Sequence, residues 1–122
     1  MAKKVLVVDD EPSITKMVES RLKAGGYEVV TATGGEEALR KCRFFKPDVV
    51  VLDVMMPDKS GDAVAEEMSE DPALHHIPII FLTAIVTKDE APKNTVGGYY
   101  YLAKPFKGKE LLETIQRVLG KG

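Results

Sequence analysis

The sequence has little of several features that mark specialised proteins. It contains no tryptophan and one cysteine, Cys42, which excludes an internal disulfide and any metal site built from several cysteines. No apolar run approaches the roughly 20 residues that a membrane-spanning helix needs. Neither sign of charge dominates, because 17 Lys and Arg residues stand against 19 Asp and Glu residues, a net charge of −2. The clustered basic excess of a nucleic-acid-binding protein is missing. We therefore expect neither direct nucleic-acid binding nor membrane association.

The composition of the sequence is that of an ordinary globular protein. Its 122 residues are 44% hydrophobic and 30% charged, which suits one domain with a buried core. We assign residues 1–122 to that single domain. The apolar stretch at residues 5–8 is too short for a signal peptide and is followed at once by acidic residues. The sequence therefore predicts a cytoplasmic location.

Five short apolar runs indicate β-strands. They are continuous rather than alternating, which is typical of strands covered on both faces in a parallel sheet. The runs lie at residues 5–8, 27–30, 49–52, 79–82 and 99–102.

Helical signals separate these runs. One helix begins at Pro12 and stops before Gly25, and another follows the sequence Thr33-Gly34-Gly35-Glu36, which has the form of a capping box. Further helices are predicted at residues 60–68 and 107–119. The segment 85–96 fits poorly, because Pro92 interrupts it, so we expect a fourth helix there that is short, shifted or mobile. Strands that alternate with helices predict an α/β fold with an open, doubly wound parallel sheet.

The residues that follow the predicted strands carry the chemistry. Asp9 and Asp10 follow the first strand, Asp53 the third, Thr83 the fourth and Lys104 the fifth. In open parallel sheets, ligands bind at the carboxyl ends of the strands, where these side chains would converge. Three carboxylates repel one another, and one lysine with one divalent cation would balance their charge. Ligands that are all oxygen favour Mg²⁺.

A carboxylate in these surroundings can accept a phosphoryl group. The oxygen of Asp53 would attack in line, and Lys104 and Thr83 would bind the phosphoryl oxygens. This chemistry depends mainly on positioning and electrostatics, so it needs few further groups.

These residues lie in motifs that resemble the receiver domain of the response regulators of two-component signalling. The resemblance covers almost the whole chain and implies a flavodoxin-like sheet with strand order 2-1-3-4-5 and helices on both faces. The motifs that carry it are Val7-Val8-Asp9-Asp10-Glu11, Asp53-Val54-Met55-Met56-Pro57 with Gly61, Thr83-Ala84, and Tyr101-Leu102-Ala103-Lys104-Pro105-Phe106.

The resemblance also implies roles for individual residues. Asp53 would be the phosphorylated aspartate and Lys104 would contact the phosphoryl group. Mg²⁺ would be bound by Asp9, Asp10 and Asp53, together with the backbone carbonyl of Met55.

The same resemblance implies a signalling switch rather than a turnover enzyme. Thr83 and Tyr101 would form the switch pair that responds to phosphorylation. A sensor histidine kinase or a phosphotransfer protein would supply the phosphoryl group. A downstream effector would bind the face formed by the fourth helix at 85–96, the fifth strand and the last helix.

Three other functions compete with this interpretation. A phosphatase or phosphotransferase with an aspartate nucleophile, of the haloacid dehalogenase type, needs a second acid two residues after the nucleophile, where this chain has Met55. A binding module that works without phosphorylation is disfavoured by the presence of the complete set of Asp9, Asp10, Asp53, Thr83 and Lys104. A nucleotide-binding module is disfavoured, because the sequence has no Gly-x-Gly-x-x-Gly and no Walker-type loop.

Overall fold

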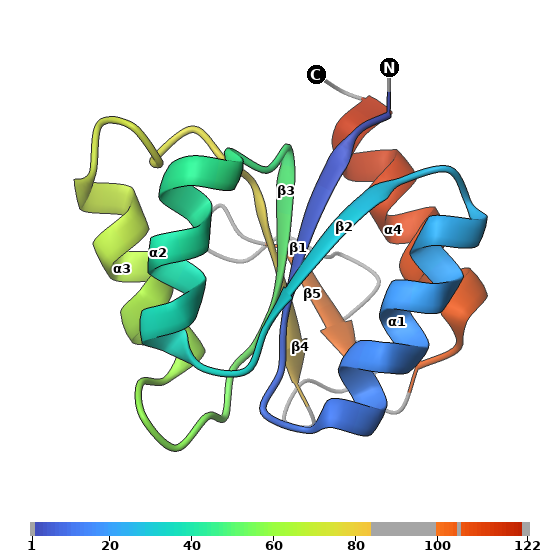
Figure 1. Cartoon of the computed structure of the whole chain (residues 1–122), viewed down its shortest axis with the longest axis horizontal. Helices are drawn as coiled ribbons and strands as arrows, with labels where there is room; N and C mark the ends of the chain where they lie inside the picture. Colours follow the sequence, from blue (N-terminus) through green and yellow to red (C-terminus); the bar gives the residue numbers. More distant parts are fainter. Residues whose placement is uncertain (1, 84–99, 105, 121–122) are drawn as a thin grey trace.

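The computed structural model describes residues 2–83, 100–104 and 106–120, which form a sheet of five parallel strands with helices on both faces (Figure 1). The order β2-β1-β3-β4-β5 confirms the predicted α/β fold. The strands are β1 (Lys4–Val8), β2 (Glu28–Ala32), β3 (Val49–Asp53), β4 (Ile79–Thr83) and β5 (Tyr100–Ala103). The helices are α1 (Pro12–Ala24), α2 (Gly35–Phe45), α3 (Gly61–Glu70) and α4 (Gly108–Gly120).

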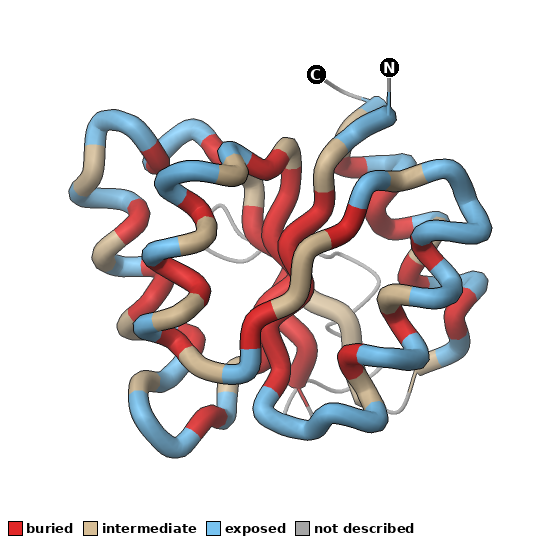
Figure 2. The backbone as a smooth tube through the Cα atoms, in the orientation of Figure 1, coloured by how far each residue is buried: buried red, intermediate tan, exposed pale blue. Residues whose placement is uncertain are grey.

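The helices divide into two layers. Helices α2 and α3 cover one face of the sheet, and α1 and α4 cover the other (Figure 1). Alternate residues of each strand therefore enter different cores: Leu6 and Leu52 pack beneath α2 and α3, whereas Val7 and Val51 pack beneath α1 and α4. Buried residues run through the central strands along their whole length (Figure 2). This double burial explains why the strands read as continuous apolar runs.

The start of helix α2 differs from its prediction. The capping box placed Thr33 at the cap and Glu36 as its partner, and this is wrong: the cap residue is Gly34, which has no side chain to offer. Instead, Glu37 accepts hydrogen bonds from the backbone N–H and the hydroxyl of Thr33, at 3.0 and 3.2 Å. The amides of Gly35 and Glu36 are bound by a carboxylate from a distant loop, which no local pattern reveals.

The other predicted elements agree with the structure within a few residues. The second strand lies at Glu28–Ala32 rather than 27–30, because the N–H of Tyr27 still bonds to Leu22 at the end of α1. The predicted fourth helix at 85–96 and Tyr99, the first residue of the predicted fifth strand, lie outside the described residues. Cys42 is buried in the core, and burial raises the pKa of its thiol to about 11, so it is a packing residue.

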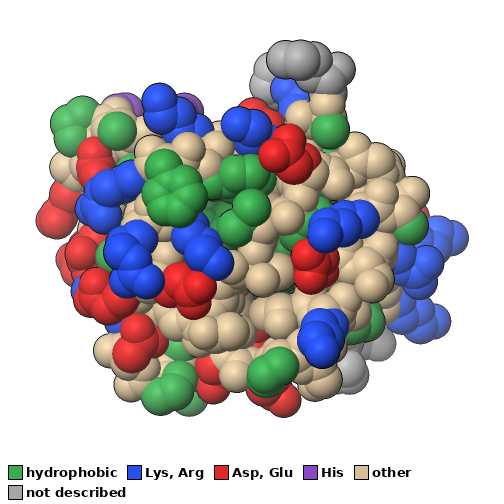
Figure 3. Space-filling view, viewed as in Figure 1, with side chains coloured by type: hydrophobic (Ala, Val, Ile, Leu, Met, Phe, Trp, Pro, Cys, Tyr) green, Lys and Arg blue, Asp and Glu red, His purple; other side chains and the backbone are tan. Residues whose placement is uncertain are grey.

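The surface carries charges of both signs. Lys, Arg, Asp and Glu side chains are interspersed over the face shown in Figure 3. Ion pairs join neighbouring turns of the helices, Lys23 with Glu19 on α1 and Lys41 with Glu37 on α2, each at 2.8 Å. Among the described residues, no helix has the length and apolar character that crossing a membrane would demand.

Gly61 marks the closest approach between a helix and the sheet. A Cβ at this position would overlap the carbonyl oxygen of Asp53 and would lie 2.9 Å from the Cα of Val54, both of them backbone atoms. The N–H of Gly61 also donates to the carbonyl of Val54 at 2.9 Å. The first turn of α3 can therefore sit against the end of β3 only when residue 61 has no side chain.

We predict that Gly61→Ala lowers the free energy of unfolding by about 1–3 kcal/mol, the usual cost of forcing an added methyl group into a packed site. Urea unfolding followed by circular dichroism measures this. Gly120→Ala is the matched control, because a Cβ there meets no atom within 4 Å. Equal unfolding midpoints for the Gly61→Ala variant and the unmodified protein would show that the contact is not tight.

Candidate functional site

The carboxyl ends of the parallel strands bring the predicted site residues to one edge of the sheet. Asp9 follows β1 directly, Asp53 ends β3, Thr83 ends β4 and Lys104 follows β5. Carboxylate oxygens of Asp9, Asp10 and Asp53 all lie within 4.8 Å of one another. We call these three residues the acidic cluster. The side chains that follow the strands therefore lie close together, as their positions in the sequence predicted.

Asp9 is the most deeply buried member of the acidic cluster. Its residue surface is 0% exposed, so its charge needs partners inside the protein. Its Oδ1 accepts a hydrogen bond from the backbone N–H of Glu11 at 2.9 Å, in the turn between β1 and α1. Its Oδ2 lies 3.2 Å from the Nζ of Lys104. Both carboxylate oxygens of Asp9 are therefore held in place by these contacts.

Asp53 lies beside it with a similar pattern of contacts. Only 4% of the residue is exposed; Oδ1 accepts from the backbone N–H of Met55 at 3.2 Å, and Oδ2 lies 3.4 Å from the Nζ of Lys104. Burial first, and then the negative charge of Asp9, raise the pKa of Asp53 above its usual value. The Met55 N–H and the Lys104 ammonium act in the opposite direction without cancelling the rise.

Lys104 holds the two buried carboxylates together. Burial on its own would lower the pKa of Lys104, but the hydrogen bond and ion pair with Asp9, followed by those with Asp53, raise it. The ammonium group is therefore a permanent positive charge at neutral pH. Its backbone is also tied to the sheet, since its N–H donates to the carbonyl of Thr83 at 2.9 Å.

Asp10 gives the acidic cluster its open side. It is exposed, whereas its two neighbours in the cluster are buried, so an ion could reach the carboxylates from solvent on its side. The donor atoms are carboxylate oxygens, with no sulfur or imidazole in the cluster, and that set fits a hard divalent cation such as Mg²⁺. Met55, two residues after Asp53, is 68% exposed.

The predicted switch pair lies on neighbouring strands. Thr83 is buried at the end of β4, and Tyr101 lies on β5, where it is paired in register with Phe81. The rings of Tyr101 and Phe81 stack with their centroids 5.4 Å apart and an interplanar angle of 28°. Tyr101 is half-buried against the core beneath α2 and α3, whereas Tyr100 packs on the opposite core. Thr83 shares the Tyr101 face, because Phe81 and Thr83 are two residues apart on one strand.

Sequence reasoning missed the contacts made by the loop that follows Asp53. Asp58 and Lys59 in this loop reach helix α2, as hydrogen bonds and ion pairs show. The available signal was the Gly34-Gly35 pair, which allows a close approach at the start of α2, but it does not say what approaches.

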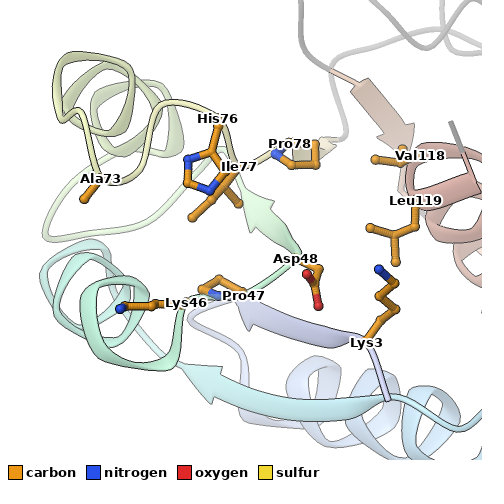
Figure 4. Close-up of a pocket in the computed structure, with 10 residues that line it drawn as sticks. All are labelled: Lys3, Lys46, Pro47, Asp48, Ala73, His76, Ile77, Pro78, Val118 and Leu119. Atoms are coloured by element: carbon orange, nitrogen blue, oxygen red, sulfur yellow. The ribbon is translucent and has the colours of Figure 1, made fainter. Parts of the chain in front are cut away.

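A cavity of about 370 Å³ lies at the opposite, amino-terminal edge of the sheet (Figure 4). Lys3, Asp48 and His76 line it, together with apolar side chains such as Ile77 and Leu119. The carboxylate of Asp48 is already held by the backbone N–H of Lys4 at 2.8 Å. None of the acidic cluster lines this cavity, so it is separate from the site described above.

Comparisons with known proteins agree with this geometry. The response regulator receiver domain family matches residues 5–116. A probable transcriptional regulator ycf27 of Guillardia theta is 48% identical over 119 residues, which are 95% of this chain and 45% of that protein. The chain thus spans about half the length of the curated transcriptional regulators that it matches.

Solved structures show the same fold. The chemotaxis protein CheY4 of Vibrio cholerae is 38% identical, with a TM-score of 0.86 over 98% of this chain and 100% of that chain. The receiver domain of the sensor histidine kinase PA1611 from Pseudomonas aeruginosa is 28% identical, with a TM-score of 0.84 over 98% of this chain and 99% of that chain. That structure is described as having a magnesium ion coordinated in its active-site cleft.

The sheet order, the acidic cluster with its lysine, and a family match over nearly the whole chain lead to one conclusion. This chain belongs to the response regulator receiver domain family, whose members are phosphoacceptor switches of two-component signalling.

Proposed function

We propose that Asp53 is the residue of this receiver domain that takes up the phosphoryl group. The observation that carries the proposal is the position of its carboxylate, which is buried at the sheet edge with Oδ2 3.4 Å from the ammonium of Lys104. Asp9 is buried deeper, beneath the edge, and Asp10 is more exposed, so neither combines access with a paired lysine in the same way.

The chemistry is a transfer from phosphohistidine to a carboxylate. A carboxylate oxygen of Asp53 forms a bond to phosphorus while the bond from phosphorus to the histidine nitrogen breaks. The electron pair of the broken bond stays on the imidazole nitrogen, which takes up a proton. The Met55 N–H, which bonds Oδ1 at 3.2 Å, orients the nucleophile. Lys104 offsets the charge of the phosphoryl oxygens as they arrive.

Mg²⁺ is the cofactor that the donor set fits. Asp9, Asp10 and Asp53 would hold it, with the backbone carbonyl of Met55 as a fourth protein ligand, and the similar PA1611 receiver domain supports this assignment. When bound, the ion offsets negative charge on the phosphoryl oxygens. Without it, the three carboxylates face one ammonium group and repel an incoming phosphate.

Phosphorylation would then shift the equilibrium between two conformations. Thr83 follows Leu82, the strand partner of Asp53, and its hydroxyl is the polar side-chain group of β4. Tyr101 lies on the same face of the sheet as Thr83, and as the second member of the switch pair it would transmit the conformational change to the protein surface. The donor would be a sensor histidine kinase or a phosphotransfer protein in the cytoplasm. An effector would bind near β5 and α4, and the chain would act as a switch without turnover.

Asp53→Asn should abolish labelling by acetyl phosphate in the presence of Mg²⁺, because the amide has nearly the same shape but is not a nucleophile. Intact-mass spectrometry measures the gain of one phosphoryl group. Asp62→Asn, which changes an exposed aspartate on α3, should be labelled normally. Labelling of the Asp53→Asn variant at the unmodified level would place the acceptor elsewhere.

Asp10→Asn should raise the dissociation constant for Mg²⁺ by at least about tenfold, since one anionic ligand is lost from the cluster. Titration of backbone amide resonances with MgCl₂ measures the constant directly. Glu113→Gln, a change on the exposed side of α4, serves as the control. A constant that Asp10→Asn leaves unchanged would remove Asp10 from the metal site.

Asp53→Asn should also raise the thermal unfolding midpoint of the metal-free protein at neutral pH. Burial and Asp9 both raise the pKa of Asp53, so its ionised form at pH 7 destabilises the fold. The gain should shrink as the pH falls through the raised pKa of Asp53 in the folded chain, and it should vanish below the ordinary pKa of an aspartate, where the carboxyl group is protonated in both the folded and the unfolded chain. A lower midpoint for the variant at pH 7 would mean that the contacts with Lys104 and Met55 outweigh the repulsion.

A further inference from the structure

The loop between β3 and α3, residues 54–60, carries the backbone that lies beside Asp53. Its first residue is fixed to the sheet, because the N–H of Val54 donates to the carbonyl of Leu82 at 3.2 Å. Its last part is fixed to α3, where the hydroxyl of Ser60 accepts from the N–H of Ala63 at 3.2 Å. Between these two ends, the loop would be free to move unless something else held it.

The middle of the loop is held by helix α2. The Oδ1 of Asp58 accepts from the N–H of Gly35 at 3.1 Å, and its Oδ2 accepts from the N–H of Glu36 at 3.2 Å. These two amides lie in the first turn of α2, where no intrahelical partner exists for them. The side chain of a distant loop therefore supplies the cap that Gly34 cannot.

Electrostatics favours this contact. A carboxylate is stabilised at the amino end of a helix by the free N–H groups and the helix dipole. The hydrogen bonds from Gly35 and then Glu36 lower the pKa of Asp58, so it is ionised at neutral pH.

Lys59 makes a second tether next to the first. Its ammonium group forms ion pairs with Glu67 on α3 and with Glu36 on α2, the latter at 3.2 Å. Its side chain is only 20% exposed, because the stem packs against the start of α2. Lys59 thus joins both helices to the loop.

The fit between the loop and α2 is close. A Cβ at Gly34 would lie 3.0 Å from each carboxylate oxygen of Asp58. A Cβ at Gly35 would lie 2.7 Å from the Cβ of Lys59 and 2.9 Å from Cγ2 of Val64. The two glycines are therefore part of the same contact, because a Cβ at Gly34 would crowd the carboxylate of Asp58 and a Cβ at Gly35 would overlap the start of the Lys59 side chain.

We propose that Asp58 and Lys59 are positioning residues that tie the β3–α3 loop to helix α2 and so hold the backbone of Met55 where the acidic cluster can use it. The inference rests on the proposed function, since it concerns the same metal site. Met55 lies between the Val54 anchor and the Asp58 anchor. Its N–H already bonds Asp53 at 3.2 Å, and its carbonyl is the proposed fourth metal ligand.

The test measures Mg²⁺ binding in variants of the tether. Asp58→Ala removes both hydrogen bonds to α2, and we expect it to raise the dissociation constant for Mg²⁺ by about tenfold, the low end for residues that support metal ligands. Asp58→Asn keeps an acceptor oxygen but loses the charge, so an intermediate value is expected. Titration of amide resonances with MgCl₂ gives the constant and shows that each variant is folded.

Glu37→Gln is the matched control. Glu37 supports the same end of α2 through hydrogen bonds from Thr33 and an ion pair with Lys41, and among the described residues it forms no hydrogen bond or ion pair with the loop. This variant should bind Mg²⁺ as the unmodified protein does. If it weakens binding as much as Asp58→Ala, then the effect comes from helix stability and the positioning role is wrong.

The dependence of labelling on Mg²⁺ separates positioning from chemistry. With acetyl phosphate as donor, Asp58→Ala should be labelled more slowly at low Mg²⁺ but at nearly the unmodified rate at saturating Mg²⁺. If Asp58→Ala does not fold, Asp58→Asn and Lys59→Met take its place, and both should weaken Mg²⁺ binding. Unchanged Mg²⁺ binding in the folded tether variants would overturn the inference.

The outcomes for the tether and for Asp53 are distinguishable. Suppose that the tether variants bind Mg²⁺ more weakly but acetyl phosphate does not label Asp53 of the unmodified protein. The positioning role of Asp58 and Lys59 would then stand, and the assignment of Asp53 as the phosphoacceptor would be wrong. If Asp53 is labelled normally and the tether variants have unchanged dissociation constants for Mg²⁺, the positioning role is wrong and Asp53 remains the acceptor.

Discussion

The repulsion between Asp9 and Asp53 is the constraint on which the rest of this structure depends. Two buried carboxylates meet at one sheet edge, with a third at its rim, and one ammonium group lies between the buried pair at 3.2 and 3.4 Å. A site built only for stability would replace such a cluster with apolar side chains. A bound divalent cation would relieve this repulsion and would also offset the charge that a phosphoryl group adds, so binding of the ion is coupled to the stability of the site.

The fold fixes Asp9, Asp53 and Lys104 at the ends of three different strands, β1, β3 and β5. Register in this sheet allows little slip, because the two faces of the strands pack against different cores and a shift by one residue would exchange them. Asp53 and Lys104 are therefore located by apolar residues far from any ligand. The tight packing of Gly61 against the end of β3 extends the same precision to the loop beyond it.

Much of this could be predicted from the sequence, because the strongest signals are periodic and local. The continuous apolar runs gave the strands, and the acids and the lysine directly after them gave the site, since carboxyl ends of parallel strands must meet. The start of α2 could not be predicted. The cap comes from Asp58, which is 23 positions away from Gly35 in the chain, whereas the local pattern suggested Thr33. Contacts between residues that are far apart in the sequence produce no periodic pattern from which they could be predicted.

The most direct test of the account is a crystal structure of the protein grown with MgCl₂ and beryllium fluoride, a stable mimic of a phosphoryl group. The account predicts density for a beryllium fluoride group whose beryllium is bonded to a carboxylate oxygen of Asp53 and whose fluorine accepts a hydrogen bond from the ammonium group of Lys104. It also predicts a metal ion at about 2.0–2.1 Å from oxygens of Asp10 and Asp53. Density for the mimic on another residue, or a metal bound away from the acidic cluster, would contradict it.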